Sequence, residues 1–309
     1  MNVLVTGGTG LVGRSLRAFL SDAIYLGQRS SRGQHGIDLR DQHAVQELFN
    51  THKYDAVIHL ASHVGGIVAN SGQMYDFFID NVRINTNVLD ACVSHQIPRV
   101  IVIGSSCAYP KSGPFPLKEE NLHDGPAEDT NFAYAYVKRM AEVQMRAACK
   151  QFGSEWTMLI PVNLYGPYDN FHLENAHVIP ALIHKLHIAK VRGLPSLEIY
   201  GTGKPMRQFL FARDFAKIIA SFLRRDIRGV FNVSPPEEYN IADAVEGIRR
   251  VVGYNGEIRW NGQLDGVLRK TVDTSKIQTY LAQMHFTPLR QGLNETYAWF
   301  KRQDICMLQ

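Results

Sequence analysis

The first half of the chain alternates short, continuously apolar runs with longer runs of mixed polarity. An unbroken apolar run is typical of a strand buried on both faces, and a longer mixed run is typical of a helix that covers such a sheet. The expected strands are 2–6, 23–27, 55–60, 99–104 and 155–160. The expected helices between them are 13–20, 41–50, 73–95 and 133–152. This alternation predicts an α/β fold with a Rossmann-type, doubly wound parallel sheet.

The alternation loosens after Pro161, where Gly, Pro, Asn and aromatic residues become frequent. Further helices are expected at 178–190, 212–224 and 240–252, and short strands at 197–201 and 229–233. We therefore expect a Rossmann domain over 1–165 and, over 166–309, mainly a smaller C-terminal α/β substrate lobe. A segment near 212–235 is expected to return to the main sheet.

Composition narrows the class of protein. With 45% hydrophobic and 20% charged residues, the chain of 309 residues resembles an ordinary globular protein. The net charge of +4 is small and the basic residues are scattered, so neither nucleic acid nor a membrane is the expected partner. Cys92, Cys107, Cys149 and Cys306 lack CxxC and zinc spacing, which predicts reduced thiols and no metal site. Because a strand is expected from Asn2 and no apolar run approaches about 18 residues, we expect a cytoplasmic protein.

A glycine-rich turn follows the first expected strand. The stretch "VTGGTGLVG" places glycines at positions 7, 8, 10 and 13, where the next helix begins. Glycines there permit a tight turn, close approach of the backbone to a pyrophosphate, and close packing of helix on strand. A structural turn alone would not require four glycines within seven residues. The pattern therefore predicts a dinucleotide site.

The second expected strand runs into "GQRSSRG", which contains Arg29 and Arg32 but no acid. An NAD site usually carries Asp or Glu here for the ribose 2′-hydroxyl, whereas arginine suits the 2′-phosphate of NADP. Solvated loop arginines are the alternative. We therefore expect residues 1–165 to bind NADPH (NADP+), with Asp38 and Leu39 beside the adenine.

The fourth expected strand ends in "GSSC", residues 104–107, at the edge of the sheet where parallel sheets bind ligands. Further along, "YAYVK" places Tyr134 and Lys138 four residues apart, on one face of a helix. Tyrosine ordinarily has a pKa near 10, and a nearby ammonium is expected to lower it. Ser105 would then donate a hydrogen bond to a substrate carbonyl oxygen. These residues together predict a carbonyl reductase site.

The glycine turn, the serine and the Tyr–Lys pair together resemble the extended short-chain dehydrogenase/reductase superfamily. Five longer motifs resemble the GDP-L-fucose synthase family: "HVGGIVAN" (63–70), "GSSCAYPK" (104–111), "PVNLYGPYDNFHLENAHVIPAL" (161–182), "GTGKPMRQFL" (201–210) and "DGVLRKTVD" (265–273). The similarity spans Asn2 to about Trp299. It implies an enzyme that uses NADPH for 3,5-epimerisation and 4-reduction of GDP-4-keto-6-deoxy-D-mannose to GDP-L-fucose.

The resemblance also implies roles for individual residues. Cys107 is expected to be the base and His177 the acid of the epimerisation, while Tyr134 and Ser105 hold the C4 oxygen and Tyr134 protonates it. Without the resemblance, Cys107 would be read as a small core residue and His177 as a helix cap or a packed side chain. The expected cofactor-binding residues are Gly7, Gly8, Thr9, Gly10, Leu11, Val12, Gly13, Arg29, Arg32, Asp38, Leu39, Leu60, Ala61, Ser62, Gly104, Ser105, Tyr134, Lys138, Pro161, Asn163, Leu164 and His177.

The substrate residues follow from the same resemblance. The expected set is Ser106, Cys107, Asn163, Val178, Lys185, Tyr200, Arg207, Asp265 and Lys270. Arg207 matches a diphosphate ligand of the family. Lys185 stands where the family typically has arginine and Tyr200 where tryptophan is common, so the chain departs from the pattern at two positions.

Three other functions are alternatives for a chain with this fold. A 4,6-dehydratase would want an Asp–Glu pair next to Ser105, where this chain has Ser106 and Cys107. A 4-epimerase that retains NAD typically has an acid at the end of the second strand. An NADPH sensor that has lost catalysis would commonly lack the Tyr–Lys pair. The family further implies a homodimer through a four-helix interface built from helices 73–95 and 133–152.

Overall fold

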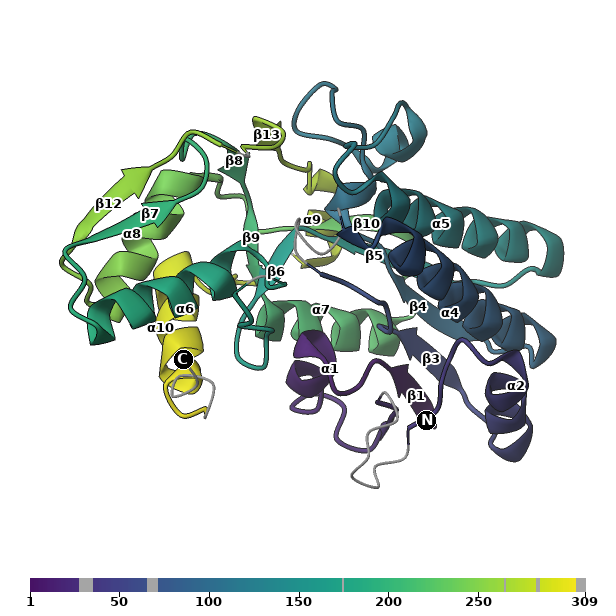
Figure 1. Ribbon diagram of the computed structural model, residues 1–309. Helices are drawn as coiled ribbons and strands as arrows, with labels where there is room; N and C mark the ends of the chain where they lie inside the picture. Colours follow the sequence, from purple (N-terminus) through teal and green to yellow (C-terminus); the bar gives the residue numbers. More distant parts are fainter. Residues whose placement is uncertain (28–35, 66–71, 174, 264, 282–283, 304–309) are drawn as a thin grey trace.

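The structure is a computed structural model, and it describes residues 1–27, 36–65, 72–173, 175–263, 265–281 and 284–303. A six-stranded parallel sheet forms its centre (Figure 1). Its strand order is β10 (Gly229–Val233), β5 (Thr157–Pro161), β4 (Arg99–Ile103), β3 (Ala56–His59), β1 (Val3–Thr6) and β2 (Ile24–Tyr25). The predicted α/β fold with a doubly wound parallel sheet is thereby confirmed.

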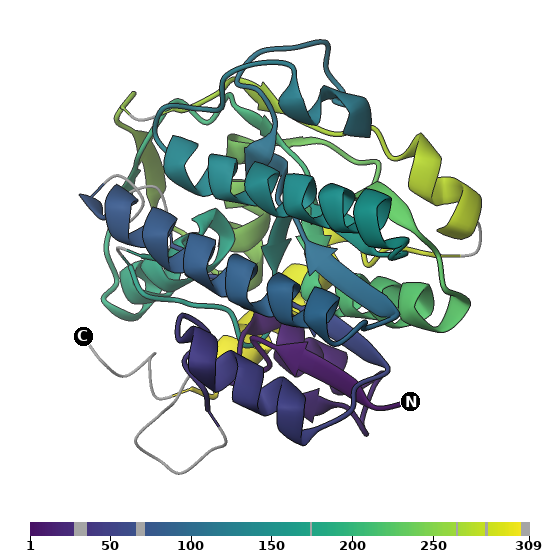
Figure 2. The same ribbon diagram turned by 90° about the vertical axis from the view of Figure 1, so that its right-hand side faces the viewer.

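Helices cover both faces of this sheet, as Figures 1 and 2 show. One layer consists of α2 (Gln42–Thr51), α4 (Met74–Ser94) and α5 (Phe132–Phe152), and the other of α1 (Leu11–Leu16) and α7 (Ala212–Arg225). The strands are buried at nearly every position, which explains their continuously apolar sequences. The strand order reverses beside β1, so the carboxyl ends of β1 and β3 form the crevice where such sheets bind ligands.

The smaller lobe lies beside the carboxyl ends of the main strands, on the left in Figure 1. Its helices are α6 (Val178–Val191), α8 (Ile241–Val252) and α10 (Leu289–Phe300), which pack around their own buried cluster. Its short sheets pair β6 (Asn163–Tyr165) with β9 (Phe209–Phe211), β12 (Glu257–Trp260) with β7 (Ser196–Ile199), and β8 (Met206–Arg207) with β11 (Tyr239–Asn240) and β13 (Arg269–Lys270). The remaining elements are η1 (Ser106–Ala108), η2 (Glu119–His123) and α9 (Ser275–Leu281). The division into domains at residue 165 stays a prediction.

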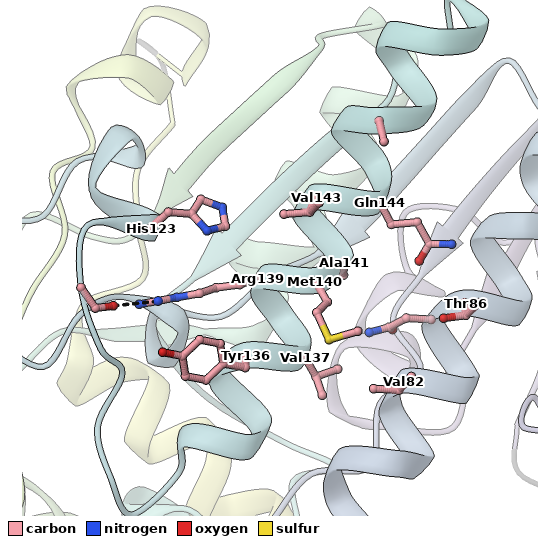
Figure 3. Close-up of a pocket in the computed structure, with 13 residues that line it drawn as sticks. Val82, Thr86, His123, Tyr136, Val137, Arg139, Met140, Ala141, Val143 and Gln144 are labelled. Carbon is pink, nitrogen blue, oxygen red and sulfur yellow. Dashed lines mark hydrogen bonds between the residues drawn. The ribbon is translucent and has the colours of Figure 1, made fainter.

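A groove of about 650 Å³ lies between α4 and α5 on the outer side of their layer (Figure 3). Its lining includes Val82 of α4 and Tyr136, Met140 and Val143 of α5. Each of these last three side chains is exposed. Within the described part of the chain, no helix is both long and apolar enough to cross a membrane.

The predicted elements differ from the observed ones mainly at their ends. β2 comprises only two residues, and α1 stops at Leu16, four residues before the predicted end. Eight elements in the described part of the second half were not predicted: β6, β8, β9, β11, β12, β13, α9 and α10. The exposed and half-buried positions of β12 alternate, and such a short, weak alternation gives little signal beside a polar neighbourhood.

Candidate active site

The glycine-rich turn packs tightly against two strands. Gly7 has a φ of +69°, and a Cβ there would lie 2.7 Å from the backbone nitrogen of Ala61 at the end of β3. The nitrogen of Gly8 donates to the oxygen of Leu26, 2.7 Å away, and a Cβ on Gly13 would lie 2.6 Å from the oxygen of Gly7. The turn therefore has no room for side chains at these positions. Thr9 and Gly10 are exposed, with Leu11 and Val12 half-buried behind them.

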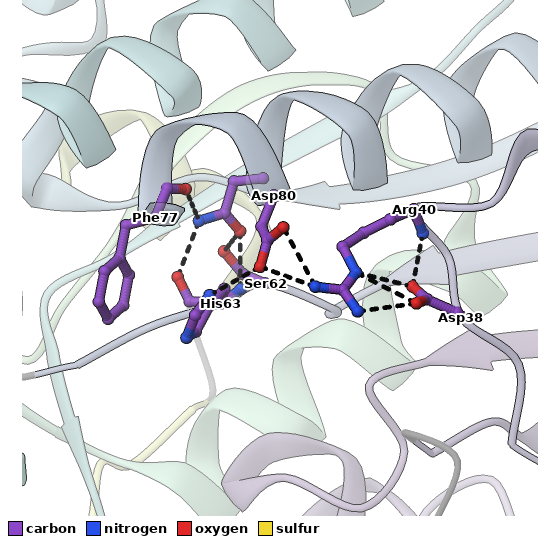
Figure 4. Close-up of polar contacts among 7 residues, drawn as sticks. Asp38, Arg40, Ser62, His63, Phe77 and Asp80 are labelled. Atoms are coloured by element: carbon purple, nitrogen blue, oxygen red, sulfur yellow. Dashed lines mark hydrogen bonds and ion pairs between the residues drawn. The ribbon is translucent and has the colours of Figure 1, made fainter. Parts of the chain in front are cut away.

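The adenine side of the predicted site is only partly described. Arg29 and Arg32 lie outside the described residues. The Asp38 carboxylate accepts hydrogen bonds from Nε and Nη2 of Arg40, which lower its pKa, and Arg40 also binds Asp80 at 3.1 Å (Figure 4). The carboxylate of Asp38 is thus already engaged by a cation. The half-buried Leu39 accepts a hydrogen bond from Asn87 through its backbone oxygen.

The chain that leaves β3 is held by helix α4. Leu60 and Ala61 are half-buried, and the Ser62 hydroxyl lies 2.7 Å from Oδ1 of the buried Asn81 (Figure 4). The amide nitrogen of Asn81 donates to the backbone oxygens of His63 and Phe77. Sequence reasoning missed Asn81, although a polar residue on the buried face of a helix is a signal that could have revealed it.

Tyr134 and Lys138 lie on α5 beside the end of β4. The Nζ atom of Lys138 donates to the backbone oxygen of Ile103 at 2.9 Å and lies 5.5 Å from the centre of the Tyr134 ring. Burial lowers the pKa of Lys138 to about 8. Burial also raises the pKa of Tyr134, the charge of a Cys107 thiolate adds to this rise, and hydrogen bonding with Ser62 and Ser105 opposes it.

The predicted lowering of the Tyr134 pKa by Lys138 is wrong for this structure. The loss of hydration that accompanies burial is the largest influence on this pKa, and only the hydrogen bonds with Ser62 and Ser105 oppose it. The same burial weakens the nearby cation, because Lys138 carries its charge over a narrower pH range. Tyr134 is consequently a protonated phenol at neutral pH, which is the form that an acid requires.

The "GSSC" stretch forms a short 3₁₀ turn, η1, directly after β4. The backbone of Gly104 is buried, and Ser105 has extended backbone angles and accepts a hydrogen bond from the nitrogen of Cys107 at 3.1 Å. Ser106 is buried, whereas Cys107 is partly exposed. A negative charge on Cys107 would raise the pKa values of Tyr134 and Arg207, so Cys107 lies near both, and its partial exposure shows that it is not a core residue.

His177 occupies the position before the first turn of α6, but its side chain makes no capping hydrogen bond. The imidazole is accessible at the surface, yet the surrounding protein lowers its pKa by removing water. Val178, which follows, is half-buried. The other two histidines of this helix have structural partners: His184 binds the backbone oxygen of Phe171, and His187 binds the Tyr297 hydroxyl. Among the described residues, no group of three His, Cys, Asp or Glu side chains is arranged to hold a metal.

Two predicted substrate residues come together in the smaller lobe. The Nζ atom of Lys185 on α6 lies 4.9 Å from the centre of the Tyr200 ring. Tyr200 is 57% exposed, and burial lowers the pKa of Lys185. The pair forms one cationic and aromatic surface, which neither residue would offer alone.

Arg207 and Lys270 lie opposite each other on the paired strands β8 and β13. Burial lowers the pKa of Arg207, and the charges of Cys107, Glu128 and Asp265 oppose this change. The Asp265 carboxylate accepts from the backbone nitrogen and the hydroxyl of Thr202 at 2.7 and 2.6 Å. Asp265 therefore fixes the turn that precedes Arg207.

The remaining predicted residues line the passage from β5 to β6. Pro161 ends β5 and is buried, while Leu164 is half-buried in β6. The Asn163 side-chain nitrogen donates to the backbone oxygen of Gln208 at 2.9 Å. This bond fixes Asn163 to the segment that continues from Arg207. The described part of the site thus joins two halves, one from each lobe.

Comparison with known proteins identifies the family. A profile of the NAD dependent epimerase/dehydratase family matches residues 3–242. The chain is 39% identical to a probable GDP-L-fucose synthase 1 of Oryza sativa subsp. japonica, over 98% of this chain and 93% of the relative. It is 35% identical to the GDP-L-fucose synthase of Dictyostelium discoideum, over 96% and 94% of the two chains.

A solved structure agrees with these relatives. The GDP-L-fucose synthetase of Naegleria fowleri bound to NADP superposes with a TM-score of 0.86 at 32% identity, covering 97% of this chain and 92% of that one. The matches extend over both lobes, so they include the cofactor side and the substrate side of the site. The chain therefore belongs to the GDP-L-fucose synthase family, within the NAD dependent epimerase/dehydratase family.

Proposed function

We propose that this protein converts GDP-4-keto-6-deoxy-D-mannose to GDP-L-fucose by 3,5-epimerisation and NADPH-dependent 4-reduction. The observation that carries the proposal is the position of η1 between a reductase pair and a basic surface. Cys107 follows β4 within η1 and lies near enough to Tyr134 on α5 and Arg207 on β8 for its charge to act on both. A thiol, a phenol and a guanidinium at the carboxyl end of β4 suit one site that handles both protons and an anionic sugar nucleotide.

The residues on the cofactor side fit a dinucleotide. The turn at Gly7, Gly8 and Gly13 is a cradle that any Cβ would fill, and its exposed part faces the crevice beside β1. NADPH, when bound, supplies the hydride for C4. The turn would hold its pyrophosphate, and Lys138 would hold the ribose next to the nicotinamide. The relative from Naegleria fowleri binds NADP, which supports the same choice here.

The epimerisation depends on the carbonyl at C4, which makes the hydrogens on C3 and C5 acidic. Cys107 as a thiolate removes the proton from one of these carbons, and the electron pair moves into an enolate. His177 then delivers a proton to the opposite face of that carbon, which inverts it. Cys107 then releases its proton to solvent and His177 takes one up, after which the same step at the second carbon completes the inversion.

The reduction uses the phenol and hydroxyl on the other side of the carbonyl. Ser105 donates a hydrogen bond to the C4 oxygen, and Tyr134 transfers its proton to that oxygen as the hydride reaches C4. The raised pKa of Tyr134 keeps this proton available at neutral pH. Proton transfer from a positioned side chain contributes on the order of 10²–10⁴ to a rate.

The smaller lobe would bind the GDP group. Arg207 and Lys270 form the cationic pair for the diphosphate, and Lys185 with Tyr200 offers a face for the base. Ser106 is buried within η1, so its part is to support Cys107. Asp265 would act by holding the Thr202 turn.

A homodimer through α4 and α5, in the cytoplasm, completes the proposal. Tyr136, Met140 and Val143 are 40%, 44% and 47% exposed on one stripe of α5, beside the groove shared with α4. Exposed apolar side chains gathered along a groove favour a protein partner, and a second copy would bring the same two helices. The free thiols of Cys92, Cys107 and Cys149 suit a reducing compartment.

The activity is tested by following NADPH absorbance after GDP-4-keto-6-deoxy-D-mannose is added to the purified protein. We expect oxidation of NADPH and a product that co-elutes with GDP-L-fucose. The UDP-linked 4-keto-6-deoxy sugar should react far more slowly, because the relatives are named for a GDP-linked sugar. Oxidation without conversion to the fuco configuration would reduce the proposal to a 4-reductase, and no oxidation would exclude it.

A further inference from the structure

Two consecutive residues of α5 hold the two ends of the turn that carries Cys107. Lys138 donates to the backbone oxygen of Ile103, just before η1, at 2.9 Å. Arg139 donates through Nε to the backbone oxygen of Ala108, the last residue of η1, at 2.6 Å. The helix that carries the phenol therefore also fixes the strand end that carries the thiol.

The environment of Arg139 is unusual for a guanidinium. Arg139 is 6% exposed, and burial lowers its pKa. Its Nη1 atom donates to the oxygen of Gly125 at 2.7 Å, and its Cζ atom lies 5.1 Å from the centre of the Tyr136 ring (Figure 3). Nη2 is buried and has no hydrogen-bond partner in the described part of the chain, nor does any described carboxylate pair with Arg139. A buried charge with only neutral partners is costly, so stability alone does not account for it.

The two ends of the turn depend on Arg139 to different degrees. The Gly104 nitrogen donates to the oxygen of Leu159 in β5, and together with the Lys138 bond this fixes the Ser105 end within the sheet. At the other end of the turn, the Ala108 nitrogen donates to the Ser105 oxygen, and the Ala108 oxygen accepts from Arg139. Loss of the guanidinium would therefore displace Cys107 more than Ser105.

We propose that Arg139 is a positioning residue for Cys107, and that it supports epimerisation more than reduction. This inference rests on the proposed function. Proton abstraction requires the thiolate sulfur close to the sugar C–H, and a displacement of about 1 Å can cost on the order of 10²-fold in rate. Hydride transfer to C4 depends on Tyr134, Lys138 and Ser105, and the Lys138–Ile103 and Gly104–Leu159 bonds still hold the chain next to Ser105 when Arg139 is changed.

The test compares two rates in the same preparations of wild type, Arg139→Met and Arg139→Lys. Exchange at C3 and C5 is followed by NMR in deuterated water with the keto sugar and NADP+, where no reduction occurs. Reduction is followed as NADPH oxidation, with the stereochemistry of the product. Arg146→Met is the matched control, since Arg146 lies two turns further along α5 and is exposed. Unfolding midpoints show which variants are folded.

For Arg139→Met we expect exchange to fall by about tenfold or more and NADPH oxidation by less than about threefold, with a share of product reduced at C4 without inversion. Arg139→Lys keeps a charged donor for the Ala108 oxygen and should restore part of the exchange. If the Met variant fails to fold, the same comparison of exchange with NADPH oxidation is made with the Lys variant, where exchange should still fall more than oxidation. Arg146→Met should match wild type. An equal fall of both rates would overturn the proposal, as would unchanged exchange. Absence of exchange in the wild type would instead refute the proposed function itself, and this inference with it.

Discussion

The ammonium nitrogen of Lys185 lies 4.9 Å from the centre of the Tyr200 ring, so a cation and an aromatic face are combined at the rim of the smaller lobe. From the resemblance, we expect relatives to have arginine in place of Lys185 and tryptophan in place of Tyr200. Lys185 keeps the positive charge of an arginine but not its planar, bidentate donor group, and Tyr200 keeps an aromatic face that is smaller than that of tryptophan. Nucleotide affinity is therefore where this chain should differ from its relatives, and the reacting groups are where it should not.

Removal of the Tyr200 ring should weaken substrate binding without slowing the chemistry. In Tyr200→Ala we expect KM for the GDP-sugar to rise about 5- to 150-fold, because stacking on a base contributes about 1–3 kcal/mol, while kcat changes little. Tyr200→Phe keeps the ring and should behave like wild type. Steady-state kinetics measure both constants, and a loss confined to kcat would contradict the assigned role.

Replacement of the thiol should separate the two activities. Cys107→Ser retains a small polar side chain, but a hydroxyl is a far weaker acid than a thiol and does not ionise to form the base. Proton exchange at C3 and C5 should therefore fall by on the order of 10²-fold or more. NADPH oxidation should persist on the sugar that has not been inverted. NMR of the product in deuterated water distinguishes the two steps. Normal deuterium incorporation in this variant would mean that another base acts.

The reduction should lose rate in alkaline solution. Burial lowers the pKa of Lys138 to about 8, so above that pH the lysine loses its proton and its charge. The raised pKa of Tyr134 keeps the phenol protonated over the same range. We expect kcat/KM to fall above about pH 8, and Lys138→Arg, whose guanidinium stays charged, to shift this limb upward while lowering the maximum. A flat profile up to the ordinary tyrosine range, about pH 10, would contradict the assignment.

The glycine turn allows a test of close packing that separates backbone strain from steric overlap. Gly7 and Gly153 have φ values of +69° and +68°, but a Cβ would meet Ala61 only at Gly7, with nothing within 4 Å at Gly153. Gly153→Ala should cost about 1–2 kcal/mol of unfolding free energy, since only the left-handed conformation is penalised. Gly7→Ala should cost about 1–3 kcal/mol more, from overlap with the end of β3. Urea unfolding measures both, and equal costs would show that the turn can relax.

The dimer prediction is tested by placing charge on the apolar stripe of α5. Met140→Glu and Val143→Glu would each bury a carboxylate in the interface, so we expect dissociation to monomers in light scattering. Val191→Glu is the control, because Val191 is 70% exposed on α6 in the other lobe. A wild type that is monomeric, or variants that remain dimeric, would exclude this interface.

Much of the fold could be predicted because its signals are local. Apolar runs such as 99–104 are buried strands, and the glycines after β1 are required by contacts within the turn and with β3. The carboxyl ends of parallel strands share one edge, which is why the position of "GSSC" after a strand predicted that it lies at the ligand-binding edge of the sheet. Ser105 and Cys107 lie beside Tyr134 because they follow β4 at this edge and because helix α5, which carries Tyr134, packs next to the end of β4.

The rest depends on contacts between distant segments. Arg139 and Ala108 are 31 residues apart, and nothing in "YAYVKRM" distinguishes a buried arginine from a solvated one. The pKa of Tyr134 was predicted in the wrong direction, because a sequence shows the nearby lysine but not the loss of water around both groups. The pairing of Lys185 with Tyr200 likewise requires the turn of the chain between α6 and β7.

The most direct test of the central claim is the reaction of the wild-type protein with GDP-4-keto-6-deoxy-D-mannose and NADPH in deuterated water, with the product read by NMR. If one site performs both reactions, the product has the fuco configuration and carries deuterium at C3 and C5 but not at C4. A product reduced at C4 without inversion or deuterium would show a plain reductase and would contradict the role assigned to Cys107.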